Sequence, residues 1–285
     1  MACPACFPPP KSAPAGSGKA TASGGQYQVF DAHTHIYPDA SSGFWRQPSS
    51  VDALIAAMDD AGVSKAAVIA IAPHISTEIV CKAVATHADR LVPIGSVDPR
   101  DSGALEAIDH AVRHLGVRAI KLHPRLQGIR FEDLGMLVPV ARRCAAAGVP
   151  LIICSFCGGR ELFRARTLEL CHELAVESPE TALVMAHAGG YRPLDALMIL
   201  KANSNIHVDL SFSPLYFANS SVRQDLEYLV RKADPRRVLF GSDFPEASLQ
   251  ESLAWLVELS NRLALAPGHL QAMLHDNAAR LFKTA

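Results

Sequence analysis

Short apolar segments that favour β-structure recur along this chain at intervals of roughly 30 residues. Longer segments with helical periodicity separate them. The expected strands cover residues 28–33, 65–72, 91–97, 117–122, 149–155, 181–187, 205–211 and 237–242. Eight alternating units of this kind predict a (β/α)8 TIM barrel over residues 27–285.

The bodies of these segments are almost continuously apolar, as in residues 66–71 and 183–185. Strands that are covered by helices on both faces have this composition, which indicates a parallel sheet. Gly62, Gly116 and Gly148 fall where a helix should end, directly before the next strand. An open, doubly wound sheet is the alternative fold. It is disfavoured because no Gly-x-Gly-x-x-Gly follows the first strand and because eight units suit a closed barrel.

Residues 1–26 differ from the rest of the chain, since they are rich in Pro, Gly, Ala and Ser. Such a segment buries too little apolar surface to offset the entropy lost on ordering, so we expect a disordered tail. It lacks the apolar core of a signal peptide, and the prolines at 8–10 prevent an amphipathic helix there. Cys3 and Cys6 have no second ligand pair nearby, which argues against a zinc knuckle.

Charge and cysteine content narrow the class of protein. The net charge is −1 and no run of Lys or Arg occurs, which argues against a nucleic-acid or membrane-surface partner. No apolar stretch approaches the roughly 18 residues that a membrane span requires. Seven scattered cysteines fit a reducing compartment better than a disulfide framework, so we expect a cytoplasmic protein.

Polar side chains with metal-binding capacity gather at the carboxyl ends of the expected strands. They are His33 and His35, His74, Lys121 and His123, Cys154, His187 and Asp243. The chemistry of a (β/α)8 barrel is carried out at this end of its strands. His33 and His35, two residues apart on an extended segment, point to the same side of the strand. The sequence therefore predicts a metal site at the barrel mouth.

Five segments carry a resemblance to a known family. They are residues 31–35 followed by Pro38, 120–124, 185–190, 239–245 and 276–282. In this order they resemble the amidohydrolase superfamily, and more narrowly its amidohydrolase-related branch, which includes relatives of aminocarboxymuconate-semialdehyde decarboxylase. The resemblance extends from about Tyr27 to Phe282.

The resemblance implies a role for each matching residue. His33 and His35 match the metal ligands of the first strand. Asp243 matches a carboxylate that contacts the metal and moves a proton. His187 matches a histidine that binds metal or polarises the substrate. Lys121 and His123 match a motif near the substrate.

Cys154 departs from the family pattern, in which the fifth strand usually ends in Pro-x-x-x-His. Here Pro150, Leu151, Ile152 and Ile153 precede a cysteine. A thiolate is a competent zinc ligand, so Cys154 is a candidate replacement for the histidine. The alternatives are a lost ligand with weak metal binding or low activity, a redox-sensitive Cys-x-x-Cys with Cys157, and an ordinary buried cysteine.

Imidazoles with a carboxylate suit one divalent metal ion, most readily Zn²⁺, with Mn²⁺, Fe²⁺ or Co²⁺ as alternatives. Such a site makes a water molecule acidic enough to attack a carbonyl carbon. We therefore expect a hydrolase of a small amide, ester or lactone, with Asp243 transferring the proton and His187 stabilising the oxyanion.

Two other functions stay open. The first is metal-dependent, non-oxidative decarboxylation of an unsaturated or aromatic acid, and the second is a catalytically weak barrel that binds a ligand. Arg125 and Arg160 follow the strands at 117–122 and 149–155, at the end where a substrate carboxylate would bind. A basic pair there would favour decarboxylation. A barrel of this size often forms a homodimer, which adds a second copy of the chain to the candidate partners.

Overall fold

A computed structural model describes residues 27–37, 49–156 and 163–284 of the 285-residue chain. The expected tail at 1–26, Cys157 and Arg160 lie outside these residues.

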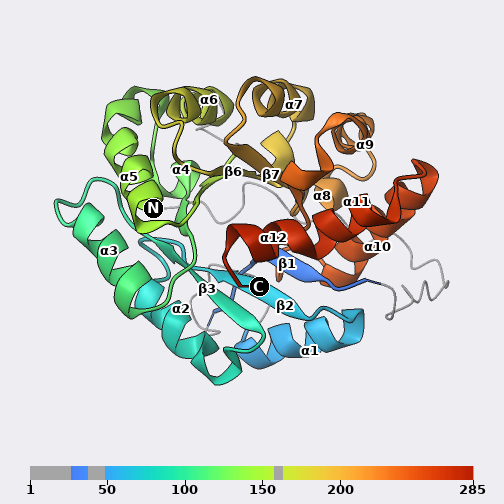
Figure 1. The fold of residues 1–285 in the computed structure, drawn as a ribbon, viewed down its shortest axis with the longest axis horizontal. Helices are drawn as coiled ribbons and strands as arrows, with labels where there is room; N and C mark the ends of the chain where they lie inside the picture. The colour runs from blue at the N-terminus through green and yellow to red at the C-terminus, as the bar shows by residue number, and fades with distance from the viewer. Residues whose placement is uncertain (1–26, 38–48, 157–162, 285) are drawn as a thin grey trace.

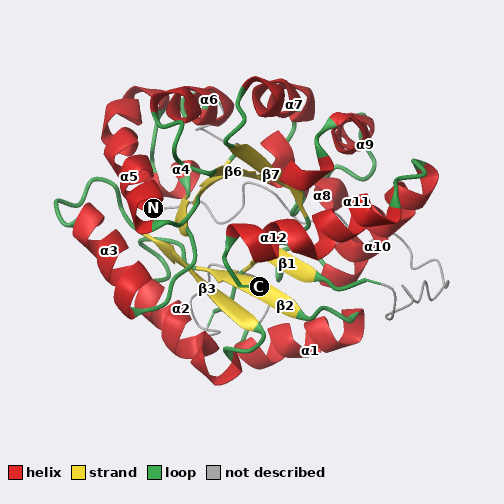
Figure 2. Ribbon diagram, viewed as in Figure 1, coloured by secondary structure: helices red, strands yellow, loops and turns green. Residues whose placement is uncertain are grey.

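Eight parallel strands form one sheet in the order β1 to β8, with helices around it (Figures 1 and 2). The strands are β1 (Phe30–Thr34), β2 (Lys65–Ile69), β3 (Leu91–Ser96), β4 (Ile120–Leu122), β5 (Leu151–Cys154), β6 (Leu183–Ala186), β7 (Ile206–Asp209) and β8 (Val238–Leu239). Each lies within or overlaps one of the eight expected segments. The predicted (β/α)8 TIM barrel is therefore confirmed.

Backbone contacts between the first and last strands close the barrel. The Ala32 amide donates to the Phe240 carbonyl at 2.9 Å, and the Asp243 amide donates to the His33 carbonyl at 2.8 Å. The buried carboxylate of Asp31 adds a side-chain connection, since its Oδ1 accepts from the amides of His33 at 3.0 Å and Ser242 at 2.9 Å. These bonds hold the ends of β1 and β8 together at the mouth.

Twelve α-helices in the described residues surround or cap the strands. They are α1 (Val51–Ala61), α2 (Thr77–Val84), α3 (Ala104–His114), α4 (Pro124–Gln127), α5 (Leu134–Ala147), α6 (Thr167–Glu177), α7 (Pro193–Ala202), α8 (Ser213–Tyr216), α9 (Val222–Lys232), α10 (Leu249–Arg262), α11 (Pro267–Gln271) and α12 (Asn277–Leu281). The first and fifth end as expected, at Gly62 and Gly148 in the left-handed conformation. Within the described part of the chain, none is long and apolar enough to cross a bilayer.

The buried apolar side chains form two groups. The larger group fills the space between the strands and the surrounding helices. The smaller group fills the barrel interior and includes Phe30, Ile94, Leu239 and, from the last helical segment, Phe282. In Figure 1 α12 lies across β1, and its contacts with β1 and β8 close the barrel at the end opposite the mouth.

Candidate metal centre

Three buried side chains from β1 and from the segments after β6 and β8 meet at the barrel mouth. They are His33, His187 and Asp243, and one potential ligand atom from each lies within 4.8 Å of the others. The imidazole rings of His33 and His187 are 4.8 Å apart between centroids. The barrel fold thus brings together the ends of strands that are far apart in the sequence. His33 and Asp243, for example, are separated by 210 positions.

Asp209, at the end of β7, fixes the orientation of His33. Its Oδ2 lies 2.9 Å from His33 Nδ1, so the protonated Nδ1 donates to the carboxylate and the Nε2 lone pair is directed into the mouth. Its Oδ1 accepts from the amides of His187 at 3.1 Å and Ser211 at 2.9 Å, and from the Ser211 hydroxyl. Burial opposes ionisation, but the hydrogen bond from His33 and the nearby His187 and Lys121 side chains hold the pKa of Asp209 well below its usual range.

Sequence reasoning missed both Asp209 and Ser211. The signal was present, because Asp209 is a carboxylate at the carboxyl end of an expected strand, as Asp243 is. His207 is the more conspicuous side chain of the same segment, but its imidazole lies outside the cluster of potential ligands in the described residues.

His187 follows β6 in a turn where four consecutive residues, 187–190, have positive φ angles. Its Nδ1 lies 2.9 Å from the Ser211 hydroxyl and 3.3 Å from the Ser211 carbonyl. With Nδ1 occupied by these partners, the second nitrogen of the ring is the one that Cys154, a cation or a substrate can contact.

His35 and His33 both face Asp243. His35 Nδ1 donates to the Ile69 carbonyl at 3.0 Å, while its Nε2 lies 3.4 Å from Asp243 Oδ1. His33 Nε2 lies 3.4 Å from the same oxygen. Burial opposes ionisation of Asp243, but the neighbouring imidazoles hold its pKa below the usual range. An ionised carboxylate between two imidazole nitrogens is a suitable arrangement for a divalent cation.

Lys121, on β4, lies at the base of this cluster. The residue is 1% exposed, and its Nζ donates to His33 Nε2 across 3.0 Å. Burial and the Lys121 charge lower the pKa of His33 to about 4, so the imidazole is neutral at pH 7. Because an imidazole nitrogen has one lone pair, His33 Nε2 can accept from Lys121 or bind a cation, but not both.

Cys154, at the end of β5, is buried between His123 and His187 and hydrogen-bonds with both. Burial alone would raise the pKa of the thiol, but the two imidazoles lower it well below its ordinary value. His123, in turn, has a pKa lowered by burial. Cys154 thus adjoins the cluster through His187, although its sulfur is not among the grouped ligand atoms of the described residues.

Aromatic side chains cover the β5–β7 side of the site. The Phe156 ring stands edge-on to His187 with centroids 6.2 Å apart, and edge-on to Phe212 at 5.1 Å. Tyr216 stacks on Phe212 at 5.0 Å. These rings give the mouth an apolar wall beside the imidazole of His187.

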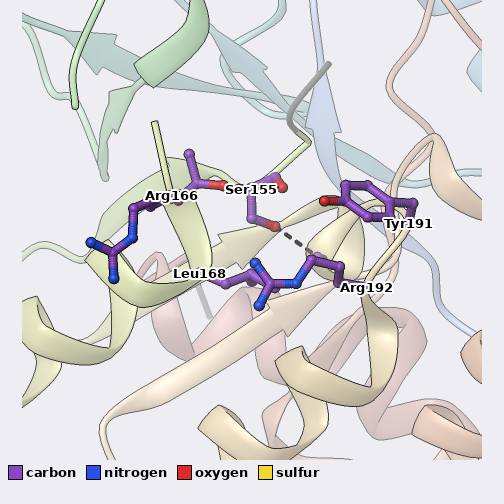
Figure 3. A pocket seen from close by; sticks show the side chains of 7 residues that line it. Ser155, Arg166, Leu168, Tyr191 and Arg192 are labelled. Carbon is purple, nitrogen blue, oxygen red and sulfur yellow. Dashed lines mark hydrogen bonds between the residues drawn. The ribbon is translucent and has the colours of Figure 1, made fainter. Parts of the chain in front are cut away.

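A small cavity of about 10 Å³ lies between the segments after β5 and β6 (Figure 3). It is lined by Ser155, Arg166, Thr167, Leu168, Gly189, Tyr191 and Arg192. The Gly189 amide donates to Ser155 Oγ at 3.0 Å, and Arg192 pairs with Glu169 at 3.0 Å and Asp195 at 2.6 Å. This space holds about one water molecule, and none of the grouped potential ligands of the described chain lines it.

Residues 30–284 match the protein family described as amidohydrolase. The chain belongs to this family. The resemblance carried by its five motifs is thereby confirmed. No curated protein matches this amidohydrolase.

Solved structures with the same fold include proteins of several descriptions. An uncharacterised TIM-barrel protein from Bordetella bronchiseptica is 18% identical, with a TM-score of 0.74 over 90% of this chain and 98% of its own. A 5-carboxyvanillate decarboxylase from Novosphingobium aromaticivorans, complexed with manganese and 4-hydroxy-3-methoxy-5-nitrobenzoic acid, is 15% identical, with a TM-score of 0.68 over 91% and 97%. A probable 2-pyrone-4,6-dicarboxylic acid hydrolase from Acinetobacter baumannii is 14% identical, with a TM-score of 0.67 over 90% and 99%.

Proposed function

We propose that this amidohydrolase is a metal-dependent hydrolase of a small amide, ester or lactone. The observation that carries the proposal is the position of Asp243 Oδ1, which lies 3.4 Å from both His33 Nε2 and His35 Nε2 in a buried site. A divalent ion held by His33, Asp243 and either His35 or His187 would supply a Lewis acid that makes water a nucleophile at neutral pH.

The roles of the protein groups follow from their contacts. Asp243 is ionised and buried, so it can accept the proton of the attacking water and return it to the leaving group. His187 Nδ1 donates to Ser211, so the second nitrogen can donate to the developing oxyanion when the ring is protonated. Burial opposes that protonation, but Cys154 and Asp243 raise the pKa of His187. Asp209 keeps His33 in the tautomer that presents Nε2 to the mouth.

The identity of the ion depends on the ligands that complete the set. His35 with His33 and Asp243 suits Zn²⁺ or Mn²⁺, and participation of the Cys154 thiolate would favour Zn²⁺. The manganese in the related decarboxylase supports a divalent ion in this position. We propose that Lys121 gives up its hydrogen bond to His33 Nε2 when an ion binds there, and that Lys121, His123 and, outside the described residues, Arg160 contact the substrate, as the sequence predicts.

The proposal is tested with the purified full chain. We expect near-stoichiometric zinc or manganese, and hydrolysis of at least one compound in a panel of small lactones, amides and esters. Chelation should abolish the activity, and Asp243→Asn should lower kcat by at least about 100-fold. Asp60→Asn, which alters an exposed carboxylate on α1, should leave the activity unchanged. A metal-free chain without activity after reconstitution would contradict the proposal.

Non-oxidative decarboxylation is the second candidate, and it is supported by the decarboxylases among the structures with this fold. In that reaction the same site would bind a carboxylic acid and release carbon dioxide. Trapping of carbon dioxide from a panel of hydroxylated benzoic acids separates the two reactions, because hydrolysis of a lactone or amide releases none.

A further inference from the structure

We propose that Arg125 binds a carboxylate of the substrate and makes the site selective for anionic compounds. This inference rests on the proposed function, because it assigns a recognition group to that same site. Neither the reaction type nor the metal identity is needed for it.

The chain path places Arg125 at the mouth of the barrel. Strand β4 ends at Leu122, His123 follows as a buried residue, and Pro124 begins the short helix α4 that contains Arg125. This is the carboxyl end of a barrel strand, where substrates of such barrels bind. The charge of Arg125 is close enough to contribute to the lowered pKa of His123, the imidazole that contacts Cys154.

The Nε atom of Arg125 is enclosed and has no hydrogen-bond acceptor among the described residues, and none of the ion pairs found among them includes this guanidinium. Other partly buried arginines are paired. Arg90 contacts Asp59 at 2.6 Å, and Arg237 donates to the carbonyls of Leu200 at 2.7 Å and Asn203 at 2.8 Å.

An enclosed N–H group without an acceptor destabilises the folded protein, and the cost is greater for a charged group. A ligand that supplies the missing acceptor would explain why a destabilising side chain lies at the mouth of the barrel. A carboxylate that approaches the partly exposed guanidinium can accept from its terminal N–H groups, and from Nε–H once the side chain turns toward the ligand.

The distribution of charge around the site agrees with this assignment. Lys121 and Arg125 place positive charge on the β4 side of the mouth, whereas Asp209 and Asp243 lie on the β7–β8 side. An anionic group of the substrate is therefore attracted toward β4, which leaves its reacting carbon toward His187 and Asp243.

Benzoate and its neutral isostere benzamide test the assignment, because a planar ring also suits the aromatic wall of Phe156 and Phe212. Their binding to the protein as purified is measured by ligand-detected NMR titration. We expect the wild type to prefer benzoate by at least about 10-fold, the gain from one charge-assisted bidentate pair. Arg125→Gln should remove this preference and leave benzamide binding unchanged, and Arg125→Lys should retain part of it.

Arg118→Gln is the matched control, since it removes one positive charge from an exposed residue at the opposite end of β4. It should bind benzoate as the wild type does. Equal binding of benzoate by Arg125→Gln and the wild type would overturn the inference, as would a wild type without preference for the anion. A chain that prefers benzoate through Arg125 but binds no metal would contradict only the proposed function.

Discussion

Asp209 connects the candidate metal ligands of two other segments through one carboxylate. One oxygen holds the His33 ring and the other holds the amide that begins the turn of His187. Such a residue acts through the groups it orients, since its own oxygens are already occupied. A substitution of Asp209 should therefore change the metal affinity more than it changes the stability of the fold.

We expect Asp209→Asn to lower metal affinity by about 10–100-fold. If the asparagine oxygen keeps the amide bonds of His187 and Ser211, its NH₂ group faces His33 Nδ1 and cannot accept a proton there. His33 then prefers the tautomer with the proton on Nε2, which cannot bind a cation. A competition titration against a chromogenic chelator measures the change, with Asp60→Asn as the control. Unchanged affinity would show that Asp209 does not set the tautomer.

The raised pKa of Asp31 predicts that the stability of the fold depends on pH. Burial raises its pKa from the ordinary value of 3.8 to about 7, so the folded state binds a proton that the unfolded state releases. Between these two pH values this group makes the folded state less stable as pH rises, by about 1.4 kcal/mol per pH unit. Below pH 3.8 both states are protonated, and this dependence ends.

Asp31→Asn should remove this contribution, because its amide oxygen can still accept from the amides of His33 and Ser242 but cannot titrate. Urea unfolding at several pH values from 4 to 7 measures the slope of the unfolding free energy in both proteins. The slope for the variant should be more positive than that of the wild type by about 1.4 kcal/mol per pH unit. Parallel slopes would show that Asp31 is ionised in the folded protein over this range.

At the scale of elements, the strands were predictable and several site contacts were not. Apolar runs such as 66–71 identify strands because a strand that is buried on both faces is apolar along almost its whole length. The strand-end rule then located His33, His187 and Asp243 without any contact information. The Lys121–His33 hydrogen bond and the unpaired Nε of Arg125 depend on side-chain directions across the barrel. No local pattern encodes those directions.

The turn after β6 shows how one element positions the site. His187, Ala188, Gly189 and Gly190 all have positive φ angles, and a Cβ on Gly189 would lie 2.9 Å from the Cβ of Ala196 on α7. The close packing of α7 against this turn therefore leaves no room for a side chain at position 189. Strained backbone of this kind persists where the surrounding packing enforces it.

We expect Gly189→Ala to destabilise the protein by more than about 2 kcal/mol, since it combines the left-handed backbone with a steric clash. Gly128→Ala is the matched control, because Gly128 has a φ of +63° but a methyl group added there would meet nothing within 4 Å. It should cost only about 1 kcal/mol. Urea unfolding measures both. Gly189→Ala should also weaken metal binding through the displaced His187, whereas equal costs for the two variants would show that the contact with α7 is not limiting.

At the scale of the whole molecule, the inner core links the two ends of the barrel. Phe282 is 1% exposed, and its ring meets Phe30 edge-on at 5.9 Å at the start of β1. The same strand carries His33 and ends directly before His35 at the mouth. The chain thus uses its last helical segment to fill the barrel interior beneath the site.

Phe282→Ala should destabilise the fold by about 3–5 kcal/mol, because it leaves a cavity that rigid strands cannot fill by relaxation. Phe163→Ala is the control, since the Phe163 side chain is 80% exposed and makes little contribution to the core. Its change in unfolding free energy should stay within about 0.5 kcal/mol. Since Phe30 and the candidate ligand His33 share β1, we also expect Phe282→Ala to lower the unfolding midpoint measured with metal bound, while the metal stoichiometry is retained. Loss of stoichiometric binding at low temperature would instead mean that the inner core sets the geometry of the site as well as its stability.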